Sequence, residues 1–93
     1  MSTWVFPVKK AYDYVLRMAP HLADDVESIR STRVEDQQYG GTTQYRRARM
    51  IKLLKDNGLW EGFCQREWPE GDTPQSHAIL NELREAYPQV LDL

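Results

Sequence analysis

The chain has 93 residues, 41% of them hydrophobic, a formal net charge of −2 at pH 7 and a single cysteine. This length builds one domain with one small core, and a lone cysteine excludes an internal disulfide framework and suits a reducing compartment. The first residues lack the apolar centre of a signal peptide, and no apolar run approaches the roughly 18 residues of a membrane helix. We therefore expect a cytoplasmic protein without a membrane span.

The charges are distributed unevenly along the chain. Residues 37–55 contain five Arg or Lys and no Asp or Glu, a charge of +5, whereas residues 1–36 carry −1 and residues 56–93 carry −6. A cationic block in an acidic chain creates a local potential that attracts phosphates or acidic partners, whatever the total charge is.

Prolines and apolar spacing predict the first two helices. Pro7 suits the first position of a helix, apolar residues then recur at helical spacing, and Pro20 stops the pattern, which predicts a helix over 7–19. Over 23–32 the acidic residues come first and the basic residues last. This order matches the helix dipole and predicts a second helix.

The middle of the chain contains a loop and the basic helix. Residues 34–43 are polar and centred on two glycines, which predicts a loop. A threonine at the end of this loop can cap a third helix over 43–57. Asn57-Gly58 is typical of a helix end with a left-handed glycine.

Two shorter helices complete the expected fold. Aromatic residues share one side of a helix over 59–68, and Thr73-Pro74 opens a helix over 74–87 that is followed by a short tail, 88–93. No segment shows the alternation of polar and apolar residues that is typical of strands. We predict that residues 1–93 form a single all-α domain, a small bundle of four to five short helices.

The aromatic residues of the fourth helix have two interpretations. Trp60, Phe63 and Trp68 supply either the large buried area that a small core needs or the anchors of a protein interface. We expect Phe63 and at least one of the tryptophans in the core, with the other partly exposed and with Trp4 and Phe6 covering part of the cluster. Cys64 is expected to be a small buried hydrophobe.

The third helix separates into an apolar and a basic face. Met50, Ile51, Leu53 and Leu54 share one arc and are expected to face the core. The basic residues lie elsewhere on the helix, close to the Gly40-Gly41 loop. Unpaired backbone N–H groups at the start of this helix also attract anions.

These features predict a non-enzymatic nucleic-acid-binding protein that contacts the phosphate backbone through the Gly40-Gly41 loop and the basic helix. A tyrosine could stack on a base of a single strand. DNA and RNA fit the pattern equally. The predicted binding residues are Thr42, Thr43, Tyr45, Arg46, Arg47, Arg49 and Lys52.

Two interpretations of the basic helix that involve no ligand remain open. The basic face is also typical of a solvated or internally paired helix surface, and Arg46 and Arg47 lie at the helix end where the dipole disfavours cations, so they could pair with the acidic fifth helix. A helix-turn-helix is poorly supported. Gly58 fits its turn, but the helix that would read DNA is nearly neutral.

A second function class is an interaction module, an adaptor or regulatory inhibitor of a larger assembly, which would use the acidic C-terminal surface and the aromatic cluster. The oligomeric state is open. Catalysis has less support, since Cys64, His21 and His77 are far apart in sequence and form no recognisable motif. We expect no metal and no cofactor.

Leu83→Ala tests the predicted fifth helix. The apolar residues of 74–87 share one face, which is expected to pack against the third and fourth helices. Removing a buried leucine side chain should lower the free energy of unfolding by roughly 2–5 kcal/mol. Thermal or urea denaturation measures this loss. A variant that unfolds at the wild-type midpoint would place Leu83 in solvent.

Overall fold

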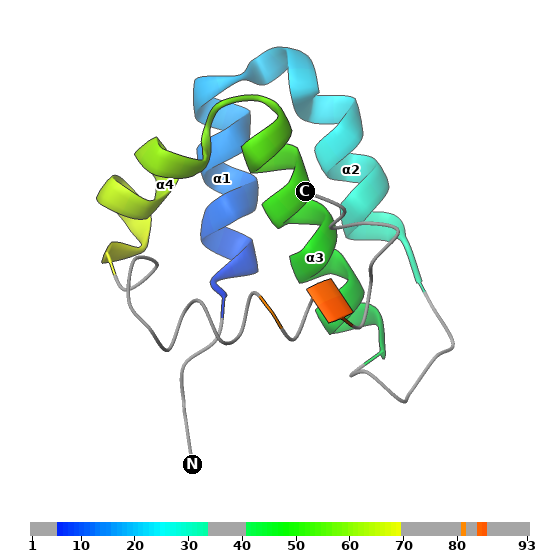
Figure 1. The fold of residues 1–93 in the computed structure, drawn as a ribbon. Coiled ribbons are helices and arrows are strands. Elements are labelled where there is room, and N and C mark those ends of the chain that lie inside the picture. The colour runs from blue at the N-terminus through cyan, green and yellow to red at the C-terminus, as the bar shows by residue number, and fades with distance from the viewer. Residues whose placement is uncertain (1–5, 34–40, 70–80, 82–83, 86–93) are drawn as a thin grey trace.

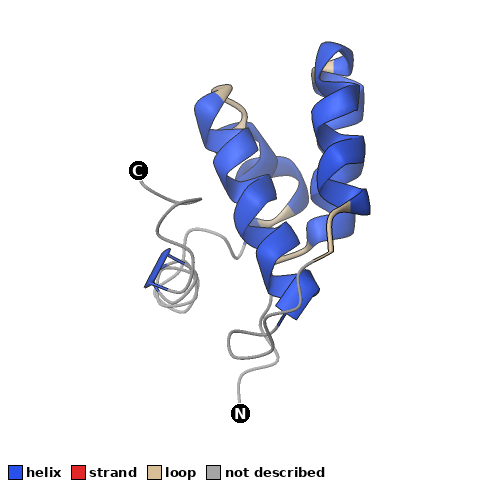
Figure 2. Ribbon diagram, turned by 90° about the vertical axis from the view of Figure 1, so that its right-hand side faces the viewer, coloured by secondary structure: helices blue, strands red, loops and turns tan. Residues whose placement is uncertain are grey.

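The computed structural model describes residues 6–33, 41–69, 81 and 84–85. Helix and loop account for all of these residues, and none of them lies in a strand (Figure 2). The elements in chain order are α1 (Val8–Met18), the short 3-10 helix η1 (Pro20–Leu22), α2 (Ala23–Ser31), α3 (Gly41–Asp56) and α4 (Trp60–Glu67). The predicted all-α bundle is confirmed.

The helix α3 lies at the centre of the described bundle. It packs against α1, α2 and α4, and α1 also packs against α2 and α4. Figure 1 shows that α1 and α3 run in the same direction, while α2 returns in the opposite direction beside them. The N-terminal halves of α1 and α3 therefore share one end of the bundle with the C-terminal half of α2.

The predicted helix boundaries agree with the structure at most ends. The helices predicted over 7–19, 23–32 and 59–68 are each found within one residue of both predicted ends. The third helix begins earlier than the predicted 43–57, because Gly41 already belongs to α3. Glycine is accepted at helix starts, so the glycine pair did not mark the end of the loop.

The earlier start of α3 changes the position of two predicted site residues. Thr42 and Thr43 lie in the first turn of α3 rather than in the loop before it. Of the loop predicted over 34–43, residues 34–40 lie outside the described part of the chain.

Most of the fifth helix predicted over 74–87, and the tail 88–93, also lie outside the described residues. The positions that are described there, Asn81, Arg84 and Glu85, are helical and exposed. The burial of Leu83 therefore stays a prediction.

A left-handed glycine joins α3 to α4. Gly58 has φ of 69°, a conformation that costs other residues energy because of their Cβ atom. The Leu59 N–H donates to the Leu54 carbonyl at 2.8 Å, and the Gly58 N–H donates to the Lys55 carbonyl at 3.3 Å. These two bonds form a Schellman motif, as the Asn57-Gly58 signal predicted, and they set the direction in which α4 leaves α3.

An aromatic cluster fills the core between α1 and α4. Phe6, Phe63 and Trp68 are at most 4% exposed. The Phe6 ring centroid lies 5.6 Å from that of Phe63 and 5.2 Å, edge-on, from that of Trp68, both favourable geometries. Trp60 stacks on Phe6 at 6.1 Å and is only half-buried. The predictions that one tryptophan is buried, that the other is partly exposed and that Phe6 covers the cluster are confirmed. Trp4, which was expected to cover it with Phe6, lies outside the described residues.

Cys64 differs from its prediction. The side chain is half-buried and packs against the edge of the core. It follows Phe63 in the helix, and a step of about 100° turns it away from the buried side.

The contact between α1 and α4 leaves no room for a side chain at Gly62. A Cβ atom there would collide with the hydroxyl oxygen of Tyr14, whereas the Tyr14 ring carbon Cζ would be at an ordinary contact distance of 3.6 Å. The Tyr14 ring is held in place, since it is 3% exposed and packs edge-on against Phe63 at 5.6 Å. The ring therefore cannot move aside without disturbing the core.

Gly62→Ala tests this close approach. In an ordinary helix the change stabilises by up to about 1 kcal/mol, but here the collision should lower the free energy of unfolding by about 1–3 kcal/mol. The matched control is Gly62→Ala combined with Tyr14→Phe, which removes the colliding oxygen and should recover most of the loss. Urea denaturation of the four chains completes a double-mutant cycle. A single Gly62→Ala variant as stable as wild type would contradict the packing described here.

Candidate functional site

The core face of α3 agrees with its prediction except at Leu53. Ala48, Met50, Ile51 and Leu54 are at most 1% exposed, while Leu53 is only half-buried. Arg47 precedes Met50 and Ile51 by three and four residues, so it lies on the same face as the core residues.

Arg47 is accordingly directed into the protein. Its Nη1 donates a short hydrogen bond to Oε1 of Gln44, and its Nε is buried without a hydrogen-bond partner among the described residues. Burial lowers the pKa of the Arg47 guanidinium, although an arginine stays charged at neutral pH. This side chain does not belong to the outer basic surface.

The outer face of α3 contains three of the predicted residues. The Arg49 guanidinium lies 5.8 Å from the centroid of the half-buried Tyr45 ring, within the range of a cation–π interaction. The Lys52 Nζ lies 3.2 Å from a carboxylate oxygen of Asp56. Asp25 and Asp56 also line a small pocket of about 140 Å³ with Arg49 and Lys52. This face is therefore mixed in charge.

The last basic residue of α3 faces α4. The Lys55 Nζ lies 5.1 Å from the centroid of the Trp60 ring. Burial lowers the pKa of Lys55, and the nearby Arg84 guanidinium lowers it further, while Cys64 opposes the shift. The five cations of residues 37–55 thus have different neighbours, and Arg47 and Lys55 do not share the surface of the other three.

Arg46 extends to the end of α2. Its Nε and Nη2 both donate to the carbonyl oxygen of Thr32, at 3.1 and 2.9 Å. Thr32 is the C-cap residue of α2, so its carbonyl belongs to the end of the helix where backbone acceptors lack intrahelical partners and carry partial negative charge. The paired bonds hold the guanidinium in one position.

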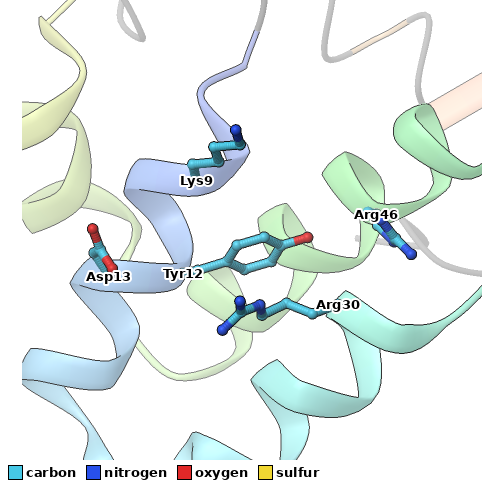
Figure 3. A pocket seen from close by; sticks show the side chains of 5 residues that line it. All are labelled: Lys9, Tyr12, Asp13, Arg30 and Arg46. Atoms are coloured by element: carbon cyan, nitrogen blue, oxygen red, sulfur yellow. The ribbon is translucent and has the colours of Figure 1, made fainter.

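A pocket of about 460 Å³ opens beside Arg46. Its walls come from three helices: α1 supplies Lys9, Tyr12 and Asp13, α2 supplies Arg30, and α3 supplies Arg46. Figure 3 shows the Tyr12 ring extending from α1 towards Arg46, with Arg30 alongside the ring and Asp13 on the opposite side from Arg46. Of the described residues, three cations and one carboxylate line this pocket.

Tyr12 is the centre of this pocket. The Arg30 guanidinium lies 5.6 Å from its ring centroid, and Arg30 also approaches Glu27 at 4.0 Å on the solvent side. Burial raises the pKa of Tyr12, although the positive charges of Arg46 and Arg30 oppose the shift. The Tyr12 hydroxyl is therefore protonated at neutral pH and can donate a hydrogen bond.

The pocket offers one ammonium, two guanidinium groups and a phenol hydroxyl. Charge-assisted hydrogen bonds from such donors to carboxylate or phosphate oxygens are short and strong. Arg46 is the one predicted site residue in the pocket; Thr42 and Thr43 lie earlier in α3. The pocket is suited to an anion with several oxygens.

The sequence pattern alone did not point to Lys9, Tyr12, Asp13 or Arg30. Lys9, Tyr12 and Asp13 are spaced three and four residues apart, so they share one face of α1. That spacing can be recognised in the sequence. The proximity of these side chains to Arg30 and Arg46 depends on how three helices pack against one another.

No protein-family model, curated protein or solved structure matches the chain. In the part of the chain that the structure describes, no three His, Cys, Asp or Glu side chains are grouped to hold a metal ion, and no helix is both long and apolar enough to cross a membrane. Function is therefore inferred from the chemistry of the pocket.

Arg30→Gln tests the electrostatics around Tyr12. A neighbouring cation stabilises the phenolate, so its removal should raise the pKa of Tyr12 further above the ordinary tyrosine value. A pH titration of the Tyr12 ring by NMR measures the change. Arg66→Gln, the same change at an exposed position of α4, should leave this pKa unaltered. An unchanged or lower pKa in Arg30→Gln would contradict the proximity of the two side chains.

Proposed function

We propose that the protein binds nucleic acid without catalysis, and that the pocket between α1, α2 and α3 receives phosphate groups of the strand. The observation that supports this function is the convergence of Lys9, Arg30 and Arg46 from three separate helices on one recess. Phosphate contacts by Lys and Arg provide most of the affinity of non-specific nucleic-acid binding.

The fixed position of Arg46 favours binding. Its two bonds to the Thr32 carbonyl restrict the side chain before a ligand arrives, so little further conformational entropy is lost on binding. A guanidinium has more N–H donors than these bonds use. The remaining donors suit the planar, two-oxygen contact that arginine makes with phosphate.

The outer face of α3 continues the contact surface beyond the pocket. Arg49 follows Arg46 by one turn, and Lys52 follows Arg49 by another. The ion pair between Lys52 and Asp56 is about 40–50% exposed at both side chains and contributes roughly 0–1 kcal/mol, so a phosphate could replace Asp56 at low cost. Tyr45, beside Arg49, supplies an aromatic face for a base.

The proposed contact residues differ from the sequence prediction at two points. Lys9 and Arg30 are added because they line the pocket, and Arg47 is left out because it faces the core. Thr42 and Thr43 stay in the proposal, as polar groups in the first turn of α3. The complete set is Lys9, Arg30, Thr42, Thr43, Tyr45, Arg46, Arg49 and Lys52.

The alternative function, an interaction module using the acidic C-terminal surface, stays a prediction. Residues 70–80, 82–83 and 86–93 lie outside the described part of the chain. Of the aromatic cluster, Trp60 is the half-buried member, and Lys55 covers part of its ring.

Substitutions that remove one positive charge, either inside or outside the pocket, test the proposed function. Lys9→Gln and Arg30→Gln each remove one pocket cation, while Lys10→Gln and Arg66→Gln remove the same charges at exposed positions away from the pocket. Fluorescence anisotropy with labelled single-stranded and duplex DNA and RNA, at several salt concentrations, gives the affinities. Each pocket variant should weaken binding and lower the slope of log K against log salt by about 0.7 for a single strand.

The controls should keep the wild-type slope. Equal losses in Lys9→Gln and Lys10→Gln would show that only total charge matters and that the pocket is not the contact. A wild-type chain that binds none of these nucleic acids at low salt would refute the proposed function.

A further inference from the structure

The pocket is open to solvent, since Lys9, Asp13 and Arg30 in its lining are exposed. Its volume of about 460 Å³ lies in the range of small-molecule sites, roughly 300–1,000 Å³, and its walls come from three sides. An internal phosphodiester continues into the strand on both sides, whereas a phosphate at the end of a strand is attached on one side only. The terminal phosphate can therefore turn more of its oxygens towards the donors of the pocket.

The charge of the pocket also favours a strand end. Among the described residues, three cations and one carboxylate line it, a formal charge of +2. An internal phosphodiester carries one negative charge, whereas a phosphate monoester carries about −1.5 to −2 at neutral pH. The monoester comes closer to neutralising the pocket.

The donors are arranged for an anion with several exposed oxygens. Figure 3 shows the Tyr12 hydroxyl directed towards Arg46, with Arg30 on one side of the ring and Lys9 on the other. A monoester presents three strong acceptor oxygens. Asp13 lies away from Arg46, so its carboxylate repels a phosphate from that side and restricts the anion to the cationic side of the pocket.

We infer that this pocket binds the terminal phosphate monoester of a single nucleic-acid strand, with Tyr12 as the residue that distinguishes a monoester from a diester. The inference rests on the proposed function and narrows its ligand. Lys9, Arg30 and Arg46 supply the charge, and the Tyr12 hydroxyl donates to an oxygen that is esterified in a diester.

The test uses one single-stranded oligonucleotide sequence with different ends. One form has a 5′-phosphate, one a 3′-phosphate, one hydroxyls at both ends, and one a 5′-methyl phosphate, which keeps the phosphorus but has the charge of a diester. Affinities are measured by anisotropy with an internal label. A phosphorylated end should bind about tenfold more tightly than the hydroxyl and methyl phosphate ends, the effect of one charge-assisted contact.

Two variants test which pocket residues cause the preference for a phosphorylated strand end. Arg30→Gln should abolish the preference for the phosphorylated end, and Tyr12→Phe should reduce it several-fold. Lys10→Gln, next to Lys9 but outside the pocket, should keep the full preference. A Tyr12→Phe variant with the wild-type preference would overturn the role of the hydroxyl.

The remaining outcomes separate this inference from the proposed function. Equal, salt-dependent affinity for all four ends would overturn the inference and leave the proposed function standing, while no binding to any strand would overturn both. A nucleoside monophosphate or inorganic phosphate is added as a competitor. Competition as strong as that of the unlabelled phosphorylated strand would show that the pocket takes a free phosphate compound, and this result would also overturn the inference.

Discussion

The described bundle depends on burying a strongly basic helix on three sides. Because α3 packs against α1, α2 and α4, its four fully buried residues serve three interfaces, and little of its circumference faces water. Two of its cations are placed against neighbouring helices, while Arg47 bonds within α3. Arg46 bonds the end of α2, Arg47 bonds Gln44, and Lys55 lies over Trp60. The local surroundings of each cation differ for this reason.

The anion-binding chemistry follows from the same constraint. A fully exposed basic helix presents mobile charges on a convex surface, and each contact with a phosphate must order a long side chain. Here the packing of α1 and α2 against α3 brings cations of three helices around the Tyr12 ring, and the Thr32 carbonyl holds one of them in place. The pocket is a consequence of helix packing, not of a motif in one segment.

Local signals were sufficient to predict most of the described helices. Pro7, Pro20 and the Asn57-Gly58 pair act on the backbone of their own neighbours, so their effects were readable from the sequence. The periodic spacing also predicted the burial of Met50, Ile51 and Leu54. The same spacing places Arg47 on the core side of α3, where it is half-buried. The site required Lys9, Arg30 and Arg46 to meet across three helices, which depends on tertiary packing that no local pattern contains.

The bond between Arg46 and Thr32 has a further consequence for the dynamics of the protein. Helix termini fray first, and local opening often involves the last turn of a helix. Here the backbone carbonyl of Thr32, at the C-terminal end of α2, is held by Arg46 of α3, which also lines the pocket. Opening of that turn would release the Arg46 guanidinium from its fixed position beside the pocket. Amide exchange at the end of α2 should thus report on the same equilibrium that holds Arg46 in place, and a bound anion would slow it.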